Sequence, residues 1–178
     1  MKEIALPEEY TMRPVRWEDA EAVAGLMRAC DLADEGESSM TVEEVKEEWR
    51  MGSFDLASDA WVVTRLEHGE EKVVGYQEVW NRAGHFNLMG DGYVHPDHRG
   101  CGIGTAQLRR AEQRAREHIP LAPAGQRVFI RNGVIGDDLA AHELHQNEGY
   151  RAVRYFWRMG IDLHDIPPAP EWPRGLSL

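Results

Sequence analysis

Residues 94–105 read VHPDHRGCGIGT and place alternate glycines at positions 100, 102 and 104, between an apolar strand and an arginine-rich helix. Glycine lets the backbone turn tightly without a Cβ in the way, so consecutive amide N–H groups can converge on one ligand. The positive end of the following helix adds to the attraction for an anion. We therefore expect this loop to cradle a pyrophosphate group. The alternative is that the glycines only form the turn between strand and helix.

Two other phosphate-binding loops do not fit this sequence. The nucleoside-triphosphate loop requires lysine and then serine or threonine after its last glycine, whereas Thr105 and Ala106 follow Gly104 here. The dinucleotide-binding loop requires its third glycine one residue later, directly after a strand, and Pro96 interrupts the strand first. Neither a nucleoside triphosphate nor a dinucleotide is the expected ligand.

The segment from Arg99 to Gly104 matches the signature Q/R-x-x-G-x-G/A of the GCN5-related N-acetyltransferases (GNAT), a family that binds acetyl-coenzyme A. The preceding Val94-His95-Pro96 resembles the V-x-P with which the family's fourth strand ends. The chain therefore resembles this family over about a dozen contiguous positions, and roughly Tyr10 to Leu163 would correspond to its fold.

The resemblance implies roles for the main chain of this segment. Backbone around Tyr93 and Val94 would pair with the pantetheine arm of acetyl-coenzyme A and polarise its thioester carbonyl. The family passes the acetyl group directly to the acceptor, so Cys101 is expected to fill space rather than act as a nucleophile. The amides expected to hold the pyrophosphate are those of Arg99, Gly100, Cys101, Gly102, Ile103, Gly104 and Thr105.

Composition narrows the class of protein. The chain has 178 residues, 42% of them hydrophobic, which suits a single domain with a core at about residues 10–163 and a proline-rich tail at 164–178. A formal charge of −11, from 31 acidic and 20 basic residues, disfavours nucleic acid as a partner. No apolar run suits a signal peptide or a membrane span, so we expect a cytoplasmic protein. Cys30 and Cys101 fit neither a disulfide framework nor a metal site, and no metal is expected.

Hydrophobic periodicity predicts alternating strands and helices. Strands are expected at residues 10–16, 60–66, 73–80, 86–94, 128–131 and 150–163, and helices at 18–30, from 41 onward, at 105–118 and at 139–147. The second helix opens on Thr41-Val42-Glu43-Glu44, which reads as a capping box. The expected fold class is α/β, with a mixed, mostly antiparallel central sheet flanked by helices. By resemblance this is the acyl-CoA N-acyltransferase fold, in which the fourth and fifth strands splay apart.

A second segment of the family reads N-x-x-A-x-x-L-Y and then G-F. The corresponding positions here run from Asp138 to His145, followed by Gly149 and Tyr150. Asp138 stands at the coenzyme-binding position where asparagine is usual, and His145 stands where the family's tyrosine protonates the thiolate. An imidazole can give up a proton at neutral pH, so His145 is a candidate acid. Water, or a tyrosine such as Tyr155, is the alternative.

Acetyl transfer to an amine also needs a base that leaves the amine neutral. Asp91 lies three residues before Val94 and is the candidate, with Glu78 and His85 as alternatives. Asp91 sits between Gly90 and Gly92, so a bulge or turn is the other interpretation.

Several side chains are open to two interpretations. Arginines of the helix at 105–118 could reach the adenosine phosphate, although Glu112 and Arg116 have the i,i+4 spacing of a salt-paired, solvated face. These arginines are Arg109, Arg110, Arg114 and Arg116. Tryptophans could line an acceptor cleft or belong to the core. These are Trp49, Trp61, Trp80 and Trp157.

The sequence thus favours an acetyl-CoA-dependent N-acetyltransferase that acts on a primary amine of a small molecule by direct attack. A protein or peptide acceptor is the second hypothesis, and a noncatalytic acyl-CoA-binding regulatory domain is the third. The resemblance also allows a homodimer built around the final strand.

Overall fold

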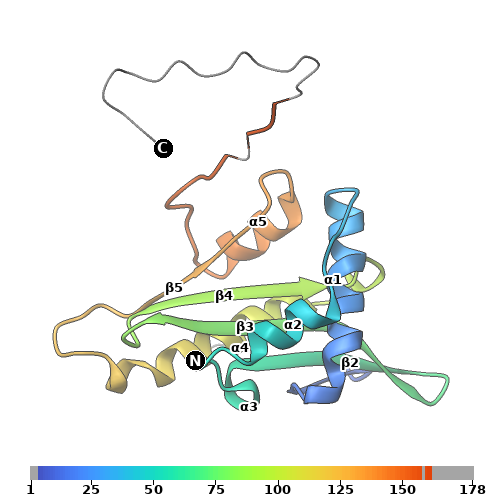
Figure 1. Ribbon diagram of the computed structural model, residues 1–178, viewed down its shortest axis with the longest axis horizontal. Helices are drawn as coiled ribbons and strands as arrows, with labels where there is room; N and C mark the ends of the chain where they lie inside the picture. Colours follow the sequence, from blue (N-terminus) through green and yellow to red (C-terminus); the bar gives the residue numbers. More distant parts are fainter. Residues whose placement is uncertain (1–3, 158, 162–178) are drawn as a thin grey trace, which may run out of the picture.

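The computed structural model describes residues 4–157 and 159–161, which form a five-stranded sheet with the order β1-β2-β3-β4-β5 (Figure 1). The strands are β1 (Tyr10–Pro14), β2 (Ala60–Glu67), β3 (Glu70–Ala83), β4 (Asn87–Val94) and β5 (Phe129–Asn132). Neighbours from β1 to β4 are antiparallel, and β5 runs parallel to β4. The prediction of a mixed, mostly antiparallel sheet is therefore confirmed.

Five α-helices accompany the sheet in the described residues. They are α1 (Ala20–Asp34), α2 (Val42–Trp49), α3 (Leu56–Asp59), α4 (Ile103–Glu117) and α5 (Leu139–Asn147). Helix α2 begins at the predicted capping box: Thr41 Oγ1 accepts from the Glu44 amide at 3.2 Å, and the Glu44 carboxylate accepts from the Thr41 amide at 2.8 Å. The sequence reading missed the short α3, whose four residues are too few to show a periodic pattern.

Helices cover both faces of the sheet, as the alternation of buried side chains requires. On one face, Val62 and Tyr76 pack with Val23 of α1 and Trp49 of α2. The opposite face carries Trp61, Val79 and Leu88, which pack with Ala111 and Ala115 of α4. Each large apolar side chain buried in this way contributes about 1.5–3 kcal/mol of transfer free energy. Both faces of the central strands are thus fixed by packing.

The sheet opens between its last two strands. Pairing of β4 with β5 ends at Gly90 and Asn132, whereas β4 continues to Val94. Beyond that pair, β4 keeps β3 as its neighbour on one side, while the chain after β5 turns away toward α5 (Figure 1). The resulting gap is the splay that the resemblance implies.

The predicted final strand at 150–163 is wrong for the residues that the structure describes. Residues 150–157 and 159–161 have no regular secondary structure, and Tyr155 and Trp157 are 72% and 85% exposed. Alternating apolar residues indicate which faces a strand would have, but a strand also needs a neighbour that supplies backbone hydrogen bonds. Residues 158, 162 and 163 and the tail at 164–178 lie outside the described residues.

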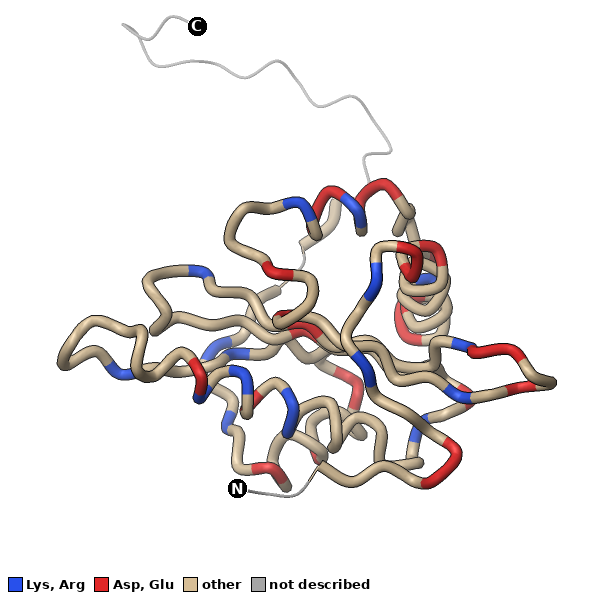
Figure 2. Tube along the Cα trace, turned by 90° about the horizontal axis from the view of Figure 1, so that it is seen from below, with Lys and Arg blue, Asp and Glu red and all other residues tan. Residues whose placement is uncertain are grey.

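Charged residues of both signs are interspersed along the trace in Figure 2. Among the described residues, no helix has the length and the apolar character that crossing a membrane requires.

Candidate active site

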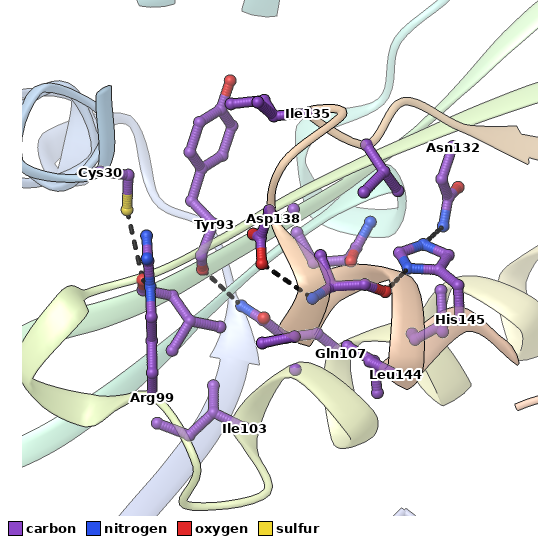
Figure 3. Close-up of a pocket in the computed structure, with 18 of the residues that line it drawn as sticks. Cys30, Tyr93, Arg99, Ile103, Gln107, Asn132, Ile135, Asp138, Leu144 and His145 are labelled. Carbon is purple, nitrogen blue, oxygen red and sulfur yellow. Dashed lines mark hydrogen bonds between the residues drawn. The ribbon is translucent and has the colours of Figure 1, made fainter. Parts of the chain in front are cut away.

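A cavity of about 730 Å³ opens where β4 and β5 part, between α1, α4 and α5 (Figure 3). Both residues predicted to carry the chemistry, Asp91 and His145, line it. The predicted coenzyme-binding residues that line it are Tyr93, Val94, Arg99, Gly100, Gly102, Ile103, Gly104, Thr105 and Asp138. Cys101 is exposed and is not among the described residues that line this cavity.

The glycine loop has the backbone conformation that its sequence suggests. Gly100 and Gly102 have φ angles of +79° and +82°, in the left-handed region that side chains rarely adopt. A Cβ at either position would meet no protein atom within 4 Å. Glycine is therefore required there by the backbone, and it leaves the loop open toward the cavity.

Helix α4 begins directly after this loop without a side-chain cap. Its first i to i−4 hydrogen bond runs from the Ala106 amide to the Gly102 carbonyl, so the preceding helical amides have no acceptor within the helix. Those amides belong to Ile103, Gly104 and Thr105, which line the cavity. Uncapped amides at the positive end of a helix fit a phosphate or pyrophosphate group.

Arg99, which opens the motif, is tied to α1. Its two terminal nitrogens each donate to the Asp34 carboxylate at 2.7 Å, and its Nε donates to the Val94 carbonyl at 3.4 Å. The guanidinium charge is therefore largely compensated. Attraction for an anion at this loop comes chiefly from the backbone amides.

Strand β4 presents a backbone edge to the gap. The His95 amide donates to the Val74 carbonyl of β3, and alternate residues of a strand direct their N–H and C=O groups to the same neighbour. Asp91 and Tyr93 therefore direct theirs to β3, whereas Val94 directs its own toward the gap. An extended ligand can pair with such an edge as a strand would.

Asp91 lies at the inner end of this edge. Its carboxylate accepts from the Gly92 amide at 2.9 Å and from the Tyr93 hydroxyl at 3.4 Å. Burial raises the pKa of Asp91, the hydrogen bonds lower it by less, and the negative charge of Asp31 adds to the rise. A carboxylate with a raised pKa is a stronger base than an exposed aspartate.

Glu78 faces Asp91 across β3 and β4 and is almost completely buried. It accepts hydrogen bonds from the Tyr76 hydroxyl and from Trp80 Nε1, the latter at 2.8 Å. Trp49 Nε1 donates in turn to the Tyr76 hydroxyl at 2.9 Å. Burial raises the pKa of Glu78 to about 7 although these donors favour the carboxylate. Glu78 is not among the described residues that line the cavity.

His145 projects into the cavity from α5 (Figure 3). Its Nδ1 lies 2.7 Å from the Ala141 carbonyl, and its Nε2 lies 3.0 Å from the side-chain amide of Asn132. Asp138 caps α5 by accepting from the Ala141 amide at 2.9 Å. Asp138 thus has a structural role in addition to its place on the cavity wall.

The profile of the Acetyltransferase (GNAT) family matches residues 15–150. The chain belongs to the GNAT family. The crystal structure of a GCN5-related N-acetyltransferase from Sphaerobacter thermophilus superimposes with a TM-score of 0.84 and 36% identity, over 96% of this chain and 52% of that one.

Two curated relatives of this GNAT protein are mycothiol acetyltransferases. That of Nocardiopsis dassonvillei is 36% identical over 101 residues, which are 57% of this chain and 27% of the relative. That of Cellulomonas flavigena is 32% identical over 111 residues, which are 62% of this chain and 30% of the relative. This GNAT chain thus spans less than a third of the length of the two curated relatives.

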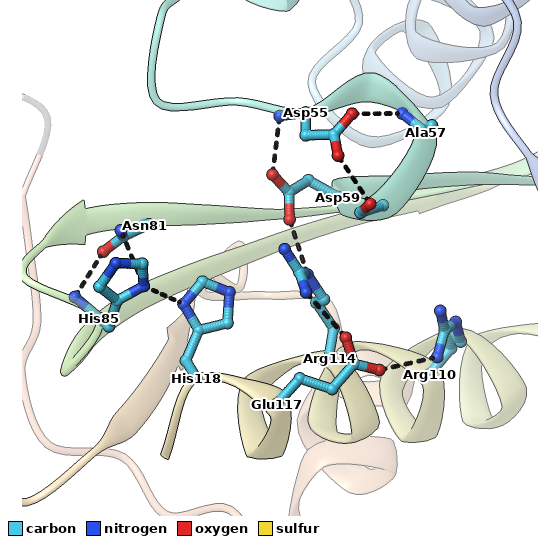
Figure 4. A network of polar contacts seen from close by, with 10 residues as sticks. Asp55, Ala57, Asp59, Asn81, His85, Arg110, Arg114, Glu117 and His118 are labelled. Atoms are coloured by element: carbon cyan, nitrogen blue, oxygen red, sulfur yellow. Dashed lines mark hydrogen bonds and ion pairs between the residues drawn. The ribbon is translucent and has the colours of Figure 1, made fainter. Parts of the chain in front are cut away.

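Two alternative candidates for the base and the acid of this GNAT chain, His85 and Tyr155, do not line the cavity. His85 bonds to Asn81 and, at 3.0 Å, to Nδ1 of His118, near the end of α4 (Figure 4). Tyr155 lies in the exposed segment after α5. The structure therefore brings Asp91 and His145 to one cavity and leaves His85 and Tyr155 outside it.

The arginines of α4 are paired with protein carboxylates or stacked on the core, as the salt-paired interpretation predicts. The predicted i,i+4 pair of Glu112 and Arg116 is present at 3.1 Å. Arg109 contacts Glu148 at 2.8 Å, Arg114 contacts Asp59 at 2.8 Å (Figure 4), and Arg110 stacks over Trp61 at 4.3 Å.

The tryptophans divide between core and surface. Trp49, Trp61 and Trp80 are buried within the core, and Trp157 is exposed. None of them is among the described residues that line the cavity. Within residues 4–157 and 159–161, no group of three metal-binding side chains comes together.

The sequence reading missed three amide side chains of this cavity, those of Gln77, Gln107 and Asn132. A Cβ on Gly90 would lie 2.5 Å from Asn132, and one on Gly92 would lie 2.6 Å from Gln77. Gly90 and Gly92 within β4 were therefore the sequence signal that side chains from neighbouring strands approach this strand closely. They leave room for neighbouring side chains.

Proposed function

We propose that this GNAT protein is an acetyl-CoA-dependent N-acetyltransferase that transfers the acetyl group directly to a primary amine of a small molecule. The observation that carries the proposal is the continuity of one cavity. It joins the uncapped amides of α4 to a carboxylate, Asp91, and an imidazole, His145. A single ligand that carries a pyrophosphate and a reactive thioester needs anion-binding amides at one end of its site and acid–base side chains at the other.

The residues present fit acetyl-coenzyme A. The amides of Ile103, Gly104 and Thr105 would hold the pyrophosphate at the start of α4. The open edge of β4 near Val94 would pair with the pantetheine arm. The coenzyme supplies an acetyl group activated as a thioester.

Asp91 and His145 divide the proton transfers. Asp91 takes the proton that the attacking amine loses, and burial raises the pKa of its carboxyl, which strengthens it as a base. As the carbon–sulfur bond breaks, the proton on Nε2 of His145 passes to the leaving sulfur. A cationic acceptor first releases one proton to solvent. The neutral amine then gains the acetyl group and gives one proton to Asp91, and the thiol departs neutral with the proton from His145, so charge and protons balance.

The charge of the cavity supports a cationic acceptor. Asp31 of α1 lines it together with Asp91, whereas Asp34 is paired with Arg99. Carboxylates attract an ammonium group and raise its local concentration. The names of the curated relatives, mycothiol acetyltransferases, support a small-molecule acceptor. We also infer that the described residues belong to one domain. The homodimer predicted around a final strand lacks that strand in residues 150–157 and 159–161.

The experiment that tests this function measures thiol release from acetyl-coenzyme A against amines, amino acids, polyamines, amino sugars and short peptides, with calorimetry of coenzyme binding. Amine-dependent thiol release with a small molecule supports the proposal. Release only with peptides favours a protein acceptor, and tight coenzyme binding without release favours a regulatory domain. Absence of coenzyme binding would overturn the assignment of the glycine loop.

A further inference from the structure

The ring of His145 is fixed by two contacts with different requirements. Its Nδ1 lies 2.7 Å from the Ala141 carbonyl oxygen, which can only accept a hydrogen bond. Nδ1 therefore carries a proton whether or not Nε2 does. The single side chain bonded to Nε2 among the described residues is Asn132, at 3.0 Å.

The side-chain amide of Asn132 has two orientations with different partners. With Nδ2 toward His145, Nε2 must accept and the ring is neutral, while Oδ1 faces other acceptors. In the reverse orientation, Nδ2 donates to the Gly90 carbonyl at 3.2 Å and to the Arg131 carbonyl at 3.0 Å. Oδ1 then accepts from Nε2, which must be protonated.

The reverse orientation satisfies more groups. Two backbone carbonyls require Nδ2 on their side, and they act whatever the charge of the ring. That leaves Oδ1 facing Nε2, where a protonated nitrogen gains a hydrogen bond and an unprotonated one meets another acceptor. The β4–β5 backbone is thereby coupled to the protonation of His145.

Gly90 makes this arrangement possible. Asn132 and Gly90 form the last pair between β5 and β4, and a Cβ on Gly90 would lie 2.5 Å from the atom of the Asn132 amide that faces Gly90. Real Cβ atoms essentially never approach so closely, so any other residue would displace the amide. The glycine weakens β4 locally, and the space it leaves is occupied by the Asn132 side chain.

We infer that Asn132 is the positioning residue of His145: its amide, seated over Gly90 where β4 and β5 part, orients the ring and accepts a hydrogen bond from a proton on Nε2. The arrangement of the two side chains stands by itself. Only the use of that proton rests on the proposed function.

Other charged and titratable groups lie on the elements around His145. The ring of Tyr150 stands edge-on at 5.3 Å, and burial raises the pKa of its hydroxyl. Glu148, after α5, is paired with Arg109 of α4 at 2.8 Å. The other charged or titratable side chains on these elements are Asp138, which caps α5, His142 and Glu143 on α5, Arg131 on β5 and Asp91 on β4.

The first test is nitrogen NMR of the histidine rings in the ligand-free protein across a pH series. We expect Nδ1 of His145 to stay protonated throughout, with Nε2 as the site that titrates. In Asn132→Leu, Nε2 should lose its proton about one pH unit lower, since one unit corresponds to roughly one hydrogen bond to a charged group. In Asn132→Asp, which can only accept, the loss should move to higher pH.

Opposite displacements in the two variants are a signature that a merely structural role would not produce. Gly90→Ala should shift the titration in the same direction as Asn132→Leu. Gly92→Ala is the matched control, because its Cβ would crowd Gln77 instead, at 2.6 Å, and it should leave the His145 titration unchanged. An unchanged midpoint in both Asn132 variants, or a neutral ring protonated on Nε2, would overturn the inference.

A second test separates this inference from the proposed function. If His145 is the acid, Asn132→Leu should lower kcat with little change in KM, and should cause no further loss in a His145→Phe background. Should His145→Phe leave kcat unchanged while the NMR displacements are present, the acid role fails and the positioning role stands. A further loss of kcat in the double variant would mean that Asn132 acts independently of His145.

Discussion

Glu78 of β3 and Asp91 of β4 lie directly opposite each other, and the charge of Asp91 adds to the burial that raises the pKa of Glu78 to about 7. Two facing carboxyl groups in a buried setting resist double ionisation. The base of the proposed reaction is therefore held beside a group that binds a proton near neutral pH.

This pair predicts a stability that falls as pH rises. The folded pKa of Glu78, about 7, exceeds its ordinary value of 4.5, so the stabilisation is complete below pH 4.5 and is lost as pH rises through 7. The free energy of unfolding should drop between pH 5 and 8 by about 2–3 kcal/mol more in the wild type than in Glu78→Gln. Urea unfolding at the two pH values measures this. Equal drops in both proteins would contradict the assignment.

Replacement of Asp91 by asparagine tests the base. Asp91→Asn should lower kcat by about 10²–10⁴, the usual contribution of general base catalysis, and leave coenzyme affinity unchanged. Wild-type kcat should fall on the acid side at a pH above the ordinary aspartate value of 3.8, because burial raises the pKa of Asp91. The pH profile of the variant should lose that limb. A limb retained in Asp91→Asn would assign it to another group.

Replacement of His145 tests the acid. His145→Phe should reduce kcat by about 10²–10⁴ while calorimetry shows similar coenzyme binding, because the proton is needed only as the sulfur leaves. His142→Phe is the matched control, since His142 lies on the same helix and is not among the cavity's lining residues. Equal activities of the two variants would remove His145 from the mechanism.

The glycine loop is tested by Gly102→Val against Gly69→Val. Both glycines have a left-handed φ, +82° and +88°, and a Cβ at either meets no protein atom within 4 Å. Each substitution should destabilise the fold by about 1–2 kcal/mol through backbone strain. Only Gly102→Val should abolish coenzyme binding in calorimetry, because only Gly102 lines the cavity. Equal binding by both variants would show that the loop does not contact the coenzyme.

Tryptophan substitutions test the segment after α5. Trp157→Ser should change the free energy of unfolding by less than about 0.5 kcal/mol, as for other exposed sites, because the ring is 85% exposed. Trp49→Phe should cost about 1 kcal/mol or more, since it removes the hydrogen bond to Tyr76 within the core. Thermal denaturation compares the two. A large loss in Trp157→Ser would mean that its ring is packed in solution.

Local patterns in the sequence were sufficient for most of the fold. The capping box at Thr41 predicts the start of α2 because both of its hydrogen bonds join residues three positions apart. The alternate glycines predict the loop before α4 because left-handed φ angles require them at Gly100 and Gly102. Such features depend only on neighbours in the chain.

Features that depend on residues far apart in the chain could not be predicted from the sequence. Gly90 is explained by Asn132, which is 42 positions away, and no periodicity links the two. The residues from Tyr150 onward alternate well, but whether they form a strand depends on a neighbouring edge that the pattern does not identify. The positions of Asp91 and His145 relative to the motifs predict their roles, and in the structure both line one cavity.

The double hydrogen bond between Arg99 and Asp34 links the glycine loop to the last residue of α1. Carboxylates are disfavoured at the negative end of a helix, and Asp31, Asp34 and Glu35 gather there, so the guanidinium relieves their repulsion. Thermodynamic linkage makes such a connection reciprocal. If a ligand binds the loop more tightly when the end of α1 is ordered, a molecule that orders the end of α1 raises the affinity of the loop for that ligand, and the ligand raises the affinity of α1 for that molecule by the same factor.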